Sequence, residues 1–335
     1  MSTDAERLTP KPIDRVVLHE VETDLVVDVR TPVADGVVAL SLVHPEGREL
    51  PAWTPGAHID LVLGESLVRQ YSLCSSPTEP GQWRIGVLLD PESRGGSQFI
   101  HDNLQPGSVV RARGPRNHFP LVSAPRYQFI AGGIGVTPIV PMIESAVANG
   151  ADWGLLYGGR RRESMAFVDE LAAHDDRVHI APEDEHGMLD LAAVLASPRE
   201  DTLVYCCGPE PLLAAVEGFC SEWPEGSLHV ERFAAKALDG GPSSDALESF
   251  DVVCQRSGIT VTVSAGQSIL EAIQEAGIGV LASCGEGVCG TCECSVIEGQ
   301  PDHRDSVLSD SEKEAGEFMM ICVSRSRSEQ LVLDL

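Results

Sequence analysis

Residues 284–299 read CGEGVCGTCECSVIEG, a segment in which thiols alternate with glycines. Four residues separate Cys284 from Cys289, two separate Cys289 from Cys292, and twenty-nine more precede Cys322. A C-x4-C-x2-C run followed by a distant cysteine is the plant-type spacing of [2Fe–2S] ligands. The spacing therefore predicts that these four thiolates hold a [2Fe–2S] cluster.

The glycines of the segment fit the same interpretation. A tight loop with left-handed backbone angles is allowed by Gly285, Gly287 and Gly290. Its N–H groups can point at the cluster sulfurs and so set the reduction potential of the cluster. Cys294 breaks the spacing and falls on a predicted strand, so we exclude it from the ligand set. Two alternatives stay open at this point: a zinc ion with four cysteine ligands, which favours paired C-x2-C units, and buried thiols that bind nothing.

Composition limits the class of protein. The 335 residues are 43% hydrophobic and include 51 acidic and 24 basic side chains, for a net charge of −27. Such a surface repels nucleic acid and anionic membranes, and no apolar run reaches the ~18 residues of a membrane span. The opening MSTDAERLTPKP lacks the pattern of a secretory signal. We therefore expect a cytoplasmic protein, in which ten cysteines do not form a disulfide framework.

Hydrophobic patterning divides the chain into three units and a linker. Residues 12–120 contain short β-branched runs between turn residues, which predicts an antiparallel β-barrel. Residues 124–235 alternate apolar strands with helical segments, which predicts a doubly wound parallel sheet. Residues 236–248 are rich in Gly, Ser and Asp, as a linker is. Residues 249–335 form a third unit with fourteen acidic and five basic side chains, a net charge of −9.

Three more motifs precede the cysteine segment: RQYSL at 69–73, GGIGVTP at 132–138 and CGP at 207–209. With these motifs in this order, the chain from about Arg15 to its C-terminus resembles the phthalate dioxygenase reductase family, which includes vanillate O-demethylase reductases and belongs to the ferredoxin–NADP reductase superfamily. The resemblance implies a multidomain protein: an FMN-binding β-barrel, an α/β domain that binds NAD(P)H, and a ferredoxin domain with a β-grasp-like fold.

The resemblance implies a flavin site on the barrel. Arg69 is suited to a bidentate ion pair with the flavin phosphate, Tyr71 is expected along the isoalloxazine ring, and Ser72 is expected to hydrogen-bond near flavin N5. The other expected flavin contacts are Leu73 and a glycine loop before a predicted helix, whose N–H groups suit a phosphate: Gly95, Gly96, Ser97 and Gln98. The family pattern favours FMN over FAD. The residues alone fit equally well a strand with an exposed Arg and a capped solvent loop.

The second motif predicts where the pyrophosphate of the nicotinamide cofactor binds. Gly132, Gly133 and Gly135 let the backbone approach a phosphate at a helix N-terminus, with Thr137 facing it and Pro138 opening the helix. The pattern differs from the GxGxxG fingerprint of two-domain dehydrogenases. A glycine turn inside an ordinary α/β unit is the alternative.

The remaining positions concern hydride transfer and coenzyme choice. By resemblance, Cys207 of the CGP motif, with Gly208 and Pro209, lies beside nicotinamide C4, and Phe233 covers the flavin face that nicotinamide must reach. Ser72, Cys207 and Phe233 are thus the expected catalytic residues, while Cys206 is expected in the core on the other side of its strand. Arg160 is expected near the adenosine ribose, where it can bind a 2′-phosphate, bind the pyrophosphate or face solvent. The family favours NADH, with NADPH as the alternative.

A hydride donor and a one-electron cluster need a flavin to convert between them. The resemblance therefore implies the reductase component of an oxygenase system, which passes electrons from NAD(P)H through FMN and the cluster to a terminal oxygenase. That partner is a Rieske non-haem iron oxygenase or demethylase, or a cytochrome P450, docked near the cluster loop and attracted by the acidic third unit. We expect a monomer without nucleic-acid or membrane partners.

Two other functions remain open from the sequence. One is a stand-alone flavin diaphorase that reduces small acceptors directly. The other, from a different class, is a zinc-stabilised interaction protein with a nucleotide-sensing α/β domain.

Overall fold

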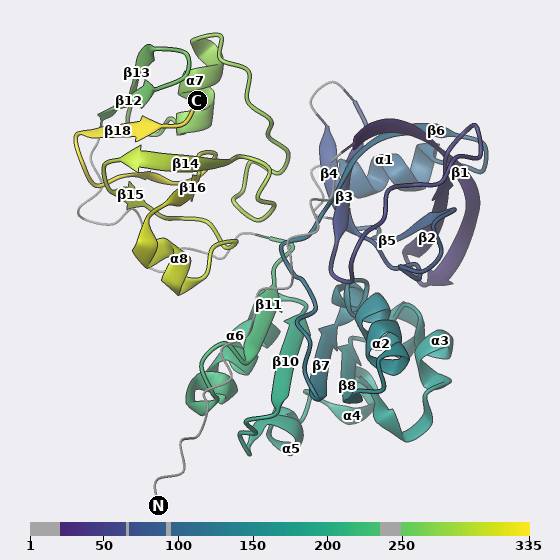
Figure 1. Cartoon of the computed structure of the whole chain (residues 1–335). Coiled ribbons are helices and arrows are strands. Elements are labelled where there is room, and N and C mark those ends of the chain that lie inside the picture. Colours follow the sequence, from purple (N-terminus) through teal and green to yellow (C-terminus); the bar gives the residue numbers. More distant parts are fainter. Residues whose placement is uncertain (1–20, 65–66, 92–94, 235–248) are drawn as a thin grey trace, which may run out of the picture.

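The computed structural model describes residues 21–64, 67–91, 95–234 and 249–335. These residues form three units, each built on its own sheet (Figure 1). The predicted linker at 236–248 lies outside the described residues. None of the described helices combines the length and hydropathy that a membrane crossing needs.

The first unit is an antiparallel β-barrel, as predicted. Its strands pair in the order β4-β3-β6-β1-β2-β5, and an isolated antiparallel bridge between Leu73 and Ile85 joins the two ends of the sheet. Alternate residues of each strand point inward, so that Leu25 and Val27 of β1 are fully buried. The elements are β1 Val21–Ala34, β2 Val37–Val43, β3 His58–Val62, β4 Val68–Ser72, β5 Trp83–Leu88, α1 Gly96–Asn103 and β6 Val109–Arg116.

The second unit is a parallel five-stranded sheet in the order β11-β10-β7-β8-β9. One face buries residues of α2 and α3, and the other buries residues of α5 and α6, so the sheet is doubly wound as predicted. The strands are β7 Arg126–Gly132, β8 Asp152–Gly159, β9 Val178–Pro182, β10 Thr202–Cys207 and β11 Leu228–Glu231. The helices are α2 Ile139–Ala148, α3 Val168–Ala172, α4 Glu183–His186, α5 Leu191–Leu195 and α6 Glu210–Phe219, with short 3-10 turns at Gly133–Val136, Arg162–Ser164, Asp175–Arg177 and Cys220–Glu222.

The third unit is a mixed sheet in the order β13-β12-β18-β14-β16, in which β12 and β18 are parallel and the other pairs antiparallel. Helix α7 buries Ile269 and Ile273 in the same core as this sheet, which gives the expected β-grasp-like fold. The elements are β12 Phe250–Cys254, β13 Ile259–Val263, α7 Ile269–Glu275, β14 Glu293–Glu298, β15 Pro301–Asp302, α8 Asp310–Ala315, β16 Phe318–Met320, β17 Arg325–Ser326 and β18 Gln330–Leu333.

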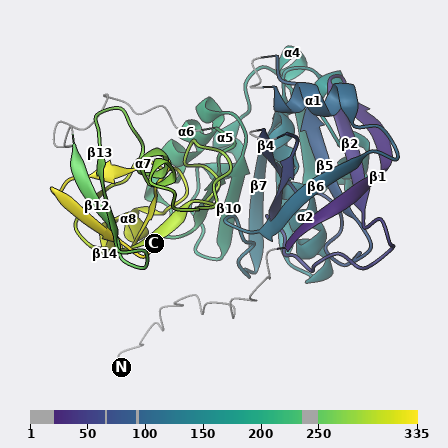
Figure 2. The same cartoon turned by 90° about the horizontal axis from the view of Figure 1, so that it is seen from above.

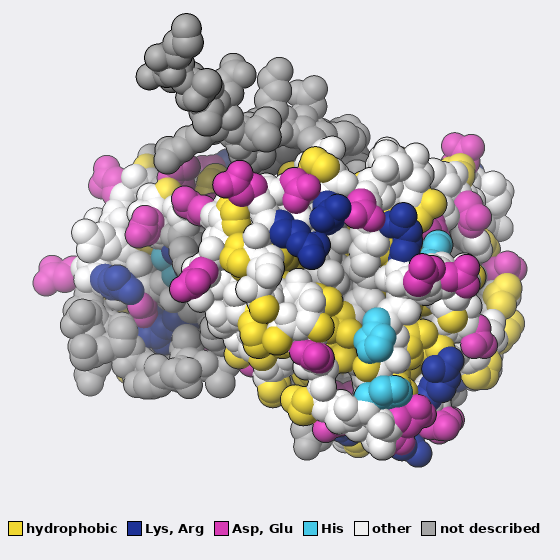
Figure 3. All heavy atoms as spheres, turned by 90° about the horizontal axis from the view of Figure 1, so that it is seen from below, with side chains coloured by type: hydrophobic (Ala, Val, Ile, Leu, Met, Phe, Trp, Pro, Cys, Tyr) yellow, Lys and Arg dark blue, Asp and Glu magenta, His cyan; other side chains and the backbone are white. Residues whose placement is uncertain are grey.

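The barrel and the α/β unit share one hydrophobic core, to which Val37 and Ala39 of the barrel contribute. Gly86 of β5 lies against Thr137, and a Cβ at Gly86 would be 2.8 Å from the Thr137 methyl. The third unit stands beside the barrel, and the loop between α7 and β14 is turned toward it (Figures 1 and 2). Figure 3 shows one face of the molecule, on which acidic side chains are scattered among smaller groups of Lys and Arg.

Candidate functional site

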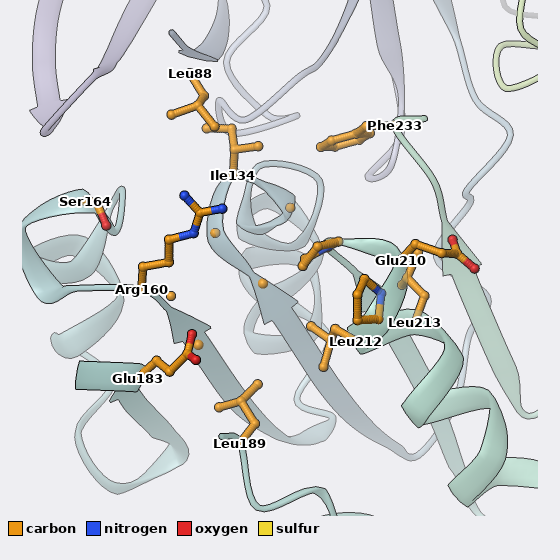
Figure 4. A pocket seen from close by; sticks show the side chains of 18 of the residues that line it. Leu88, Ile134, Arg160, Ser164, Glu183, Leu189, Glu210, Leu212, Leu213 and Phe233 are labelled. Atoms are coloured by element: carbon orange, nitrogen blue, oxygen red, sulfur yellow. The ribbon is translucent and has the colours of Figure 1, made fainter. Parts of the chain in front are cut away.

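A cavity of about 850 Å³ lies between the barrel and the C-terminal ends of the parallel strands (Figure 4). The strand order reverses between β7 and β10, and ligands of open α/β sheets bind at such a switch point. The volume is in the range of cofactor pockets. Of the predicted nucleotide-binding residues, the lining includes Gly132, Gly133, Gly135, Arg160, Gly208 and Pro209, together with Phe233.

The two glycine motifs pack against each other at the floor of this cavity. A Cβ on Gly135 would lie 2.3 Å from the backbone oxygen of Cys207, and one on Gly132 would lie 2.7 Å from Pro209 Cδ. Any side chain at these two positions would separate the loops. The glycines therefore do more than expose backbone to a phosphate: they also allow β7 and β10 to end side by side.

Thr137 and Pro138 are placed differently from the prediction. The cavity lining drawn from the described residues includes neither of them. The Thr137 hydroxyl donates to Ile134 O at 3.0 Å, and its methyl faces Gly86 of the barrel. A 3-10 turn intervenes after the strand, and α2 begins at Ile139, one residue beyond Pro138. This turn leaves Thr137 facing the barrel, outside the lining of the cavity.

Cys207 lies immediately behind the cavity floor with its side chain fully buried. It pairs in register with Glu231 on β11, and its Sγ is 3.9 Å from Glu231 Oε2. Burial raises the pKa of the Cys207 thiol well above its usual value and raises the pKa of Glu231 to about 8. Both groups are therefore neutral near pH 7. Cys206 lies in the core on the opposite face of the sheet, as predicted.

Two functional candidates were missed in the sequence. Glu231 was passed over because its pairing with Cys207 depends on the register of β10 and β11, which no local pattern reveals. Glu183, at the start of α4 after β9, also lines the cavity. Figure 4 shows Arg160 reaching into the cavity from the end of β8, with Glu183 below it. A carboxylate here can accept from ribose hydroxyls, and a guanidinium can pair with a phosphate.

Phe233 stands at the barrel side of the same cavity (Figure 4). Its side chain follows directly from the end of β11 and is 44% exposed. A large aromatic ring left this open at a cavity mouth is available to cover a planar ligand. The geometry is compatible with the expected position of Phe233 over a flavin.

The predicted phosphate residues of the flavin site come together at the N-terminus of α1. A Cβ on Gly96 would lie 2.3 Å from Arg69 Cγ, so the arginine crosses directly over the first turn. Gly95 precedes the helix at φ 87, and within the described residues no side chain caps it. Ser97 accepts from Asp90 N–H, and Gln98 donates to Asp102. The Ser97 hydroxyl keeps its own proton to donate, so it can face a phosphate together with the N–H groups of the first helical turn.

The flavin-ring residues lie on opposite sides of β4. Tyr71 packs against the barrel core, and burial raises the pKa of its phenol. Leu73 is fully buried in that core, and its N–H donates to Ala57 O at 2.8 Å, so Leu73 offers a ligand neither its side chain nor its N–H. Ser72 Oγ is buried and has no hydrogen-bond partner among the described residues. Such an orphaned hydroxyl fits a partner supplied by a bound flavin.

The cysteine loop has the backbone that its glycines predict, with φ of 68°, 69° and 70° at Gly285, Gly287 and Gly290. Glu286 N–H donates to Cys284 Sγ at 3.2 Å, as an amide directed at a thiolate sulfur does.

The four predicted ligand thiols lie together and interact in a chain, in the order Cys289, Cys284, Cys322 and Cys292. A hydrogen bond with Cys284, followed by burial, raises the pKa of the Cys289 thiol. At Cys322, a hydrogen bond with Cys284 lowers the pKa and one with Cys292 raises it, so that its pKa is about 12. In the described parts of the chain, no three His, Cys, Asp or Glu side chains converge as ligands of one metal ion. Four thiols gathered in this way fit a binuclear cluster, in which four thiolates serve two irons.

Comparisons with known proteins agree with this geometry. Residues 252–327 match the model of a 2Fe-2S iron-sulfur cluster binding domain, and residues 129–218 match that of an oxidoreductase NAD-binding domain. Phenoxybenzoate dioxygenase subunit beta from Ectopseudomonas oleovorans is 46% identical over 307 residues, which cover 90% of this chain and 94% of that protein.

Two solved structures are also similar. The phthalate dioxygenase reductase structure, described as modular for electron transfer from pyridine nucleotides to [2Fe-2S], has a TM-score of 0.69 and 34% identity, and covers 94% of this chain and 98% of that one. An intact type IV self-sufficient cytochrome P450 monooxygenase has a TM-score of 0.88 and 44% identity, and covers 94% of this chain and 41% of that one.

The chain belongs to the phthalate dioxygenase reductase family. It is an NAD(P)H-dependent electron-transfer oxidoreductase, and its cofactors are FMN and a [2Fe–2S] cluster, with NADH as the coenzyme that the family favours. The iron–sulfur prediction is confirmed, and the zinc alternative is set aside because the third unit matches an iron–sulfur domain.

Proposed function

We propose that this protein is the reductase component of an oxygenase system, which takes hydride from NADH and delivers single electrons through its ferredoxin domain to a terminal oxygenase. The observation that carries the proposal is that a nucleotide cavity, a flavin cradle and a group of four interacting thiols occur together in one chain. A bound flavin supplies the conversion between a two-electron donor and a one-electron acceptor.

The residues of the chain serve binding and exclusion rather than proton transfer. Gly132, Gly133 and Gly135 are proposed to hold the pyrophosphate, while Arg69 and the α1 amides hold the FMN phosphate. Ser72 would donate a hydrogen bond to the flavin ring. Cys207 and Glu231, both neutral, would keep the space beside nicotinamide C4 free of charge.

The partner is proposed from the names of relatives. Similar proteins are subunits of aromatic dioxygenase systems, and the most similar solved structure described above contains a cytochrome P450 monooxygenase. We propose a Rieske non-haem iron oxygenase or a P450, docked near the cluster loop, where Cys284 is the least buried of the four ligand thiols.

The test is an anaerobic titration of the purified protein with NADH. We expect the visible flavin band and the iron–sulfur band to bleach in turn, with a rhombic EPR signal from the reduced cluster. A cluster that stays oxidised while the flavin bleaches would leave only the diaphorase function.

Cys292→Ser separates the two halves of the reaction. We expect it to abolish reduction of a one-electron protein acceptor while leaving reduction of the flavin by NADH intact, because the serine removes one cluster ligand and touches nothing in the nucleotide cavity. Cys294→Ser is the matched control, since Cys294 is also buried in the third unit but lies outside the ligand set. Equal loss in both variants would refute the ligand assignment.

A further inference from the structure

One contact joins the barrel to the cluster loop, and it is made by a residue that neither cofactor site uses. A Cβ on Gly290 would lie 2.3 Å from His118 Nε2 and 2.5 Å from its Cε1. The edge of the imidazole therefore rests directly on the Gly290 backbone, one residue from Cys289. The charge of Glu312 on α8 acts on His118 as well and opposes the fall in its pKa.

The backbone that carries His118 is fixed on the barrel. Asn117 Nδ2 donates to Thr54 Oγ1 at 2.8 Å and to Pro55 O at 3.0 Å, and Asn117 Oδ1 accepts from Phe119 N–H at 2.9 Å. A Cβ on Gly56 would lie 1.9 Å from Phe119 O, so this turn packs closely on the other side as well. His118 itself is exposed, but these contacts hold its backbone in place on the barrel.

The His118 ring also contacts His58, which is paired with β4, the strand of the proposed flavin site. The ring of His118 stacks on His58, with centroids 5.7 Å apart and planes at 28°. His58 is buried and pairs in register with Ser72 on β4. Two residues after His58 on β3, Asp60 forms a buried ion pair with Arg116 at 2.6 Å. Burial, followed by the nearby Arg116, lowers the pKa of both imidazoles, which favours the neutral form of each ring.

We propose that His118 is a positioning residue that seats the cluster loop, at Gly290, against the flavin strands of the barrel. A row of packed groups, Ser72, His58, His118 and Gly290, then sets the separation between the two cofactor sites. The inference rests on the proposed function only for its rate measurement, because the seating itself is a property of the polypeptide.

The first measurement is structural and does not depend on turnover. In the cofactor-loaded protein, we expect His118→Ala to increase amide hydrogen exchange in the cluster loop at 284–292 and in the facing turn at 54–59. Absorbance must show that flavin and cluster are retained. His118→Gln, which keeps a flat polar group of similar reach, is expected to restore much of the protection.

The second measurement is a double-mutant cycle with Gly290→Ala. The added methyl displaces the His118 ring or the loop, so the double variant is expected to be little worse than either single one. Gly285→Ala is the matched control, because Gly285 has the same left-handed backbone (φ 68° against 70°) but no atom within 4 Å of an added Cβ. Its effect should add to that of His118→Ala.

The third measurement follows one electron as it leaves the reduced flavin and reduces the oxidised cluster, by stopped-flow after mixing with NADH. We expect His118→Ala to slow this step severalfold, because the rate of electron transfer between two sites falls as their separation grows. The preceding reduction of the flavin by NADH should be unchanged.

Unaltered hydrogen exchange and an unaltered transfer rate in His118→Ala would overturn the inference, as would full additivity with Gly290→Ala. Failure of the proposed function looks different, because in that case the wild-type cluster is not reduced by NADH at all, whatever residue stands at position 118.

Discussion

The position of the Arg69 side chain depends on the absence of a side chain at Gly96. The arginine reaches the first turn of α1 because Gly96 has no Cβ to obstruct its Cγ. Arg69 and Gly96, far apart in the sequence, thus come together at the place proposed for the FMN phosphate. Neither residue specifies this cradle alone.

Replacing Arg69 tests this cradle. We expect Arg69→Ala to weaken FMN binding about 10- to 100-fold, because a hydrogen bond to a charged group contributes about 1.5–3 kcal/mol. Flavin retention on gel filtration measures the loss. Arg111→Ala is the control, since Arg111 is exposed on the same barrel and pairs with Asp24. Full flavin content in Arg69→Ala would show that the phosphate binds elsewhere.

The buried carboxyl of Glu231 makes the stability of the protein depend on pH. Burial raises the pKa of its carboxyl from 4.5 to about 8, so the folded protein keeps a proton that the unfolded chain has lost. Stability therefore falls as pH rises from about 4.5 to about 8, by up to about 1.4 kcal/mol per pH unit from this group, and levels off above that window.

Glu231→Gln removes this dependence while keeping the shape of the side chain. We expect the melting temperature of the variant to exceed that of the wild type by a growing margin as the pH is raised through the same window. Glu225→Gln, at an exposed position of the same unit, should follow the wild type. Parallel curves for Glu231→Gln and the wild type would show that the carboxyl is ionised in the folded protein.

At the scale of elements, the ends of β7 and β10 are held together by glycines. Gly135→Ala would place a methyl 2.3 Å from the Cys207 carbonyl oxygen, which is backbone and cannot rotate away. We expect loss of NADH binding and a destabilisation of about 1–3 kcal/mol, as for other overpacked sites. Equilibrium binding and chemical denaturation measure the two effects.

Gly218→Ala provides the comparison for that element. Gly218 lies near the end of α6 with open space around an added Cβ. Alanine is the better helix former, so the change should be neutral or stabilise by up to about 1 kcal/mol. If Gly135→Ala also binds NADH normally, the close approach of the two loops is not needed for the cavity.

At the scale of the whole molecule, we expect the net negative charge to set how fast the protein meets a charged redox partner. The chain carries a net charge of −27, of which −9 belongs to the third unit. We expect reduction of a basic protein acceptor to slow as ionic strength rises from about 0.01 to about 0.5 M, because the Debye length falls below about 10 Å. Reduction of a neutral quinone is the control. If the rate of reduction of the protein acceptor does not change with ionic strength, electrostatic steering is excluded.

Much of the architecture was predictable because its signals are local. The cysteine spacing identified the iron–sulfur domain, and the change from β-branched runs to strand–helix alternation separated the barrel from the parallel sheet. The site was less predictable. Thr137 turned away from the cavity because a 3-10 turn precedes α2, and Leu73 proved to be a core residue with an occupied N–H. Such details depend on local geometry that residue types do not encode.

The sequence by itself predicted the iron–sulfur cluster and the order of the three units, because ligand spacing and hydrophobic period are properties of neighbouring residues, while FMN and NADH came from the family resemblance. Tertiary structure alone decided that Glu231 faces Cys207, that Gly135 meets the CGP backbone, and that His118 rests on Gly290. Each of these contacts joins residues far apart in the chain. Strand register and the docking of one unit on another fix them, and no stretch of sequence contains that information.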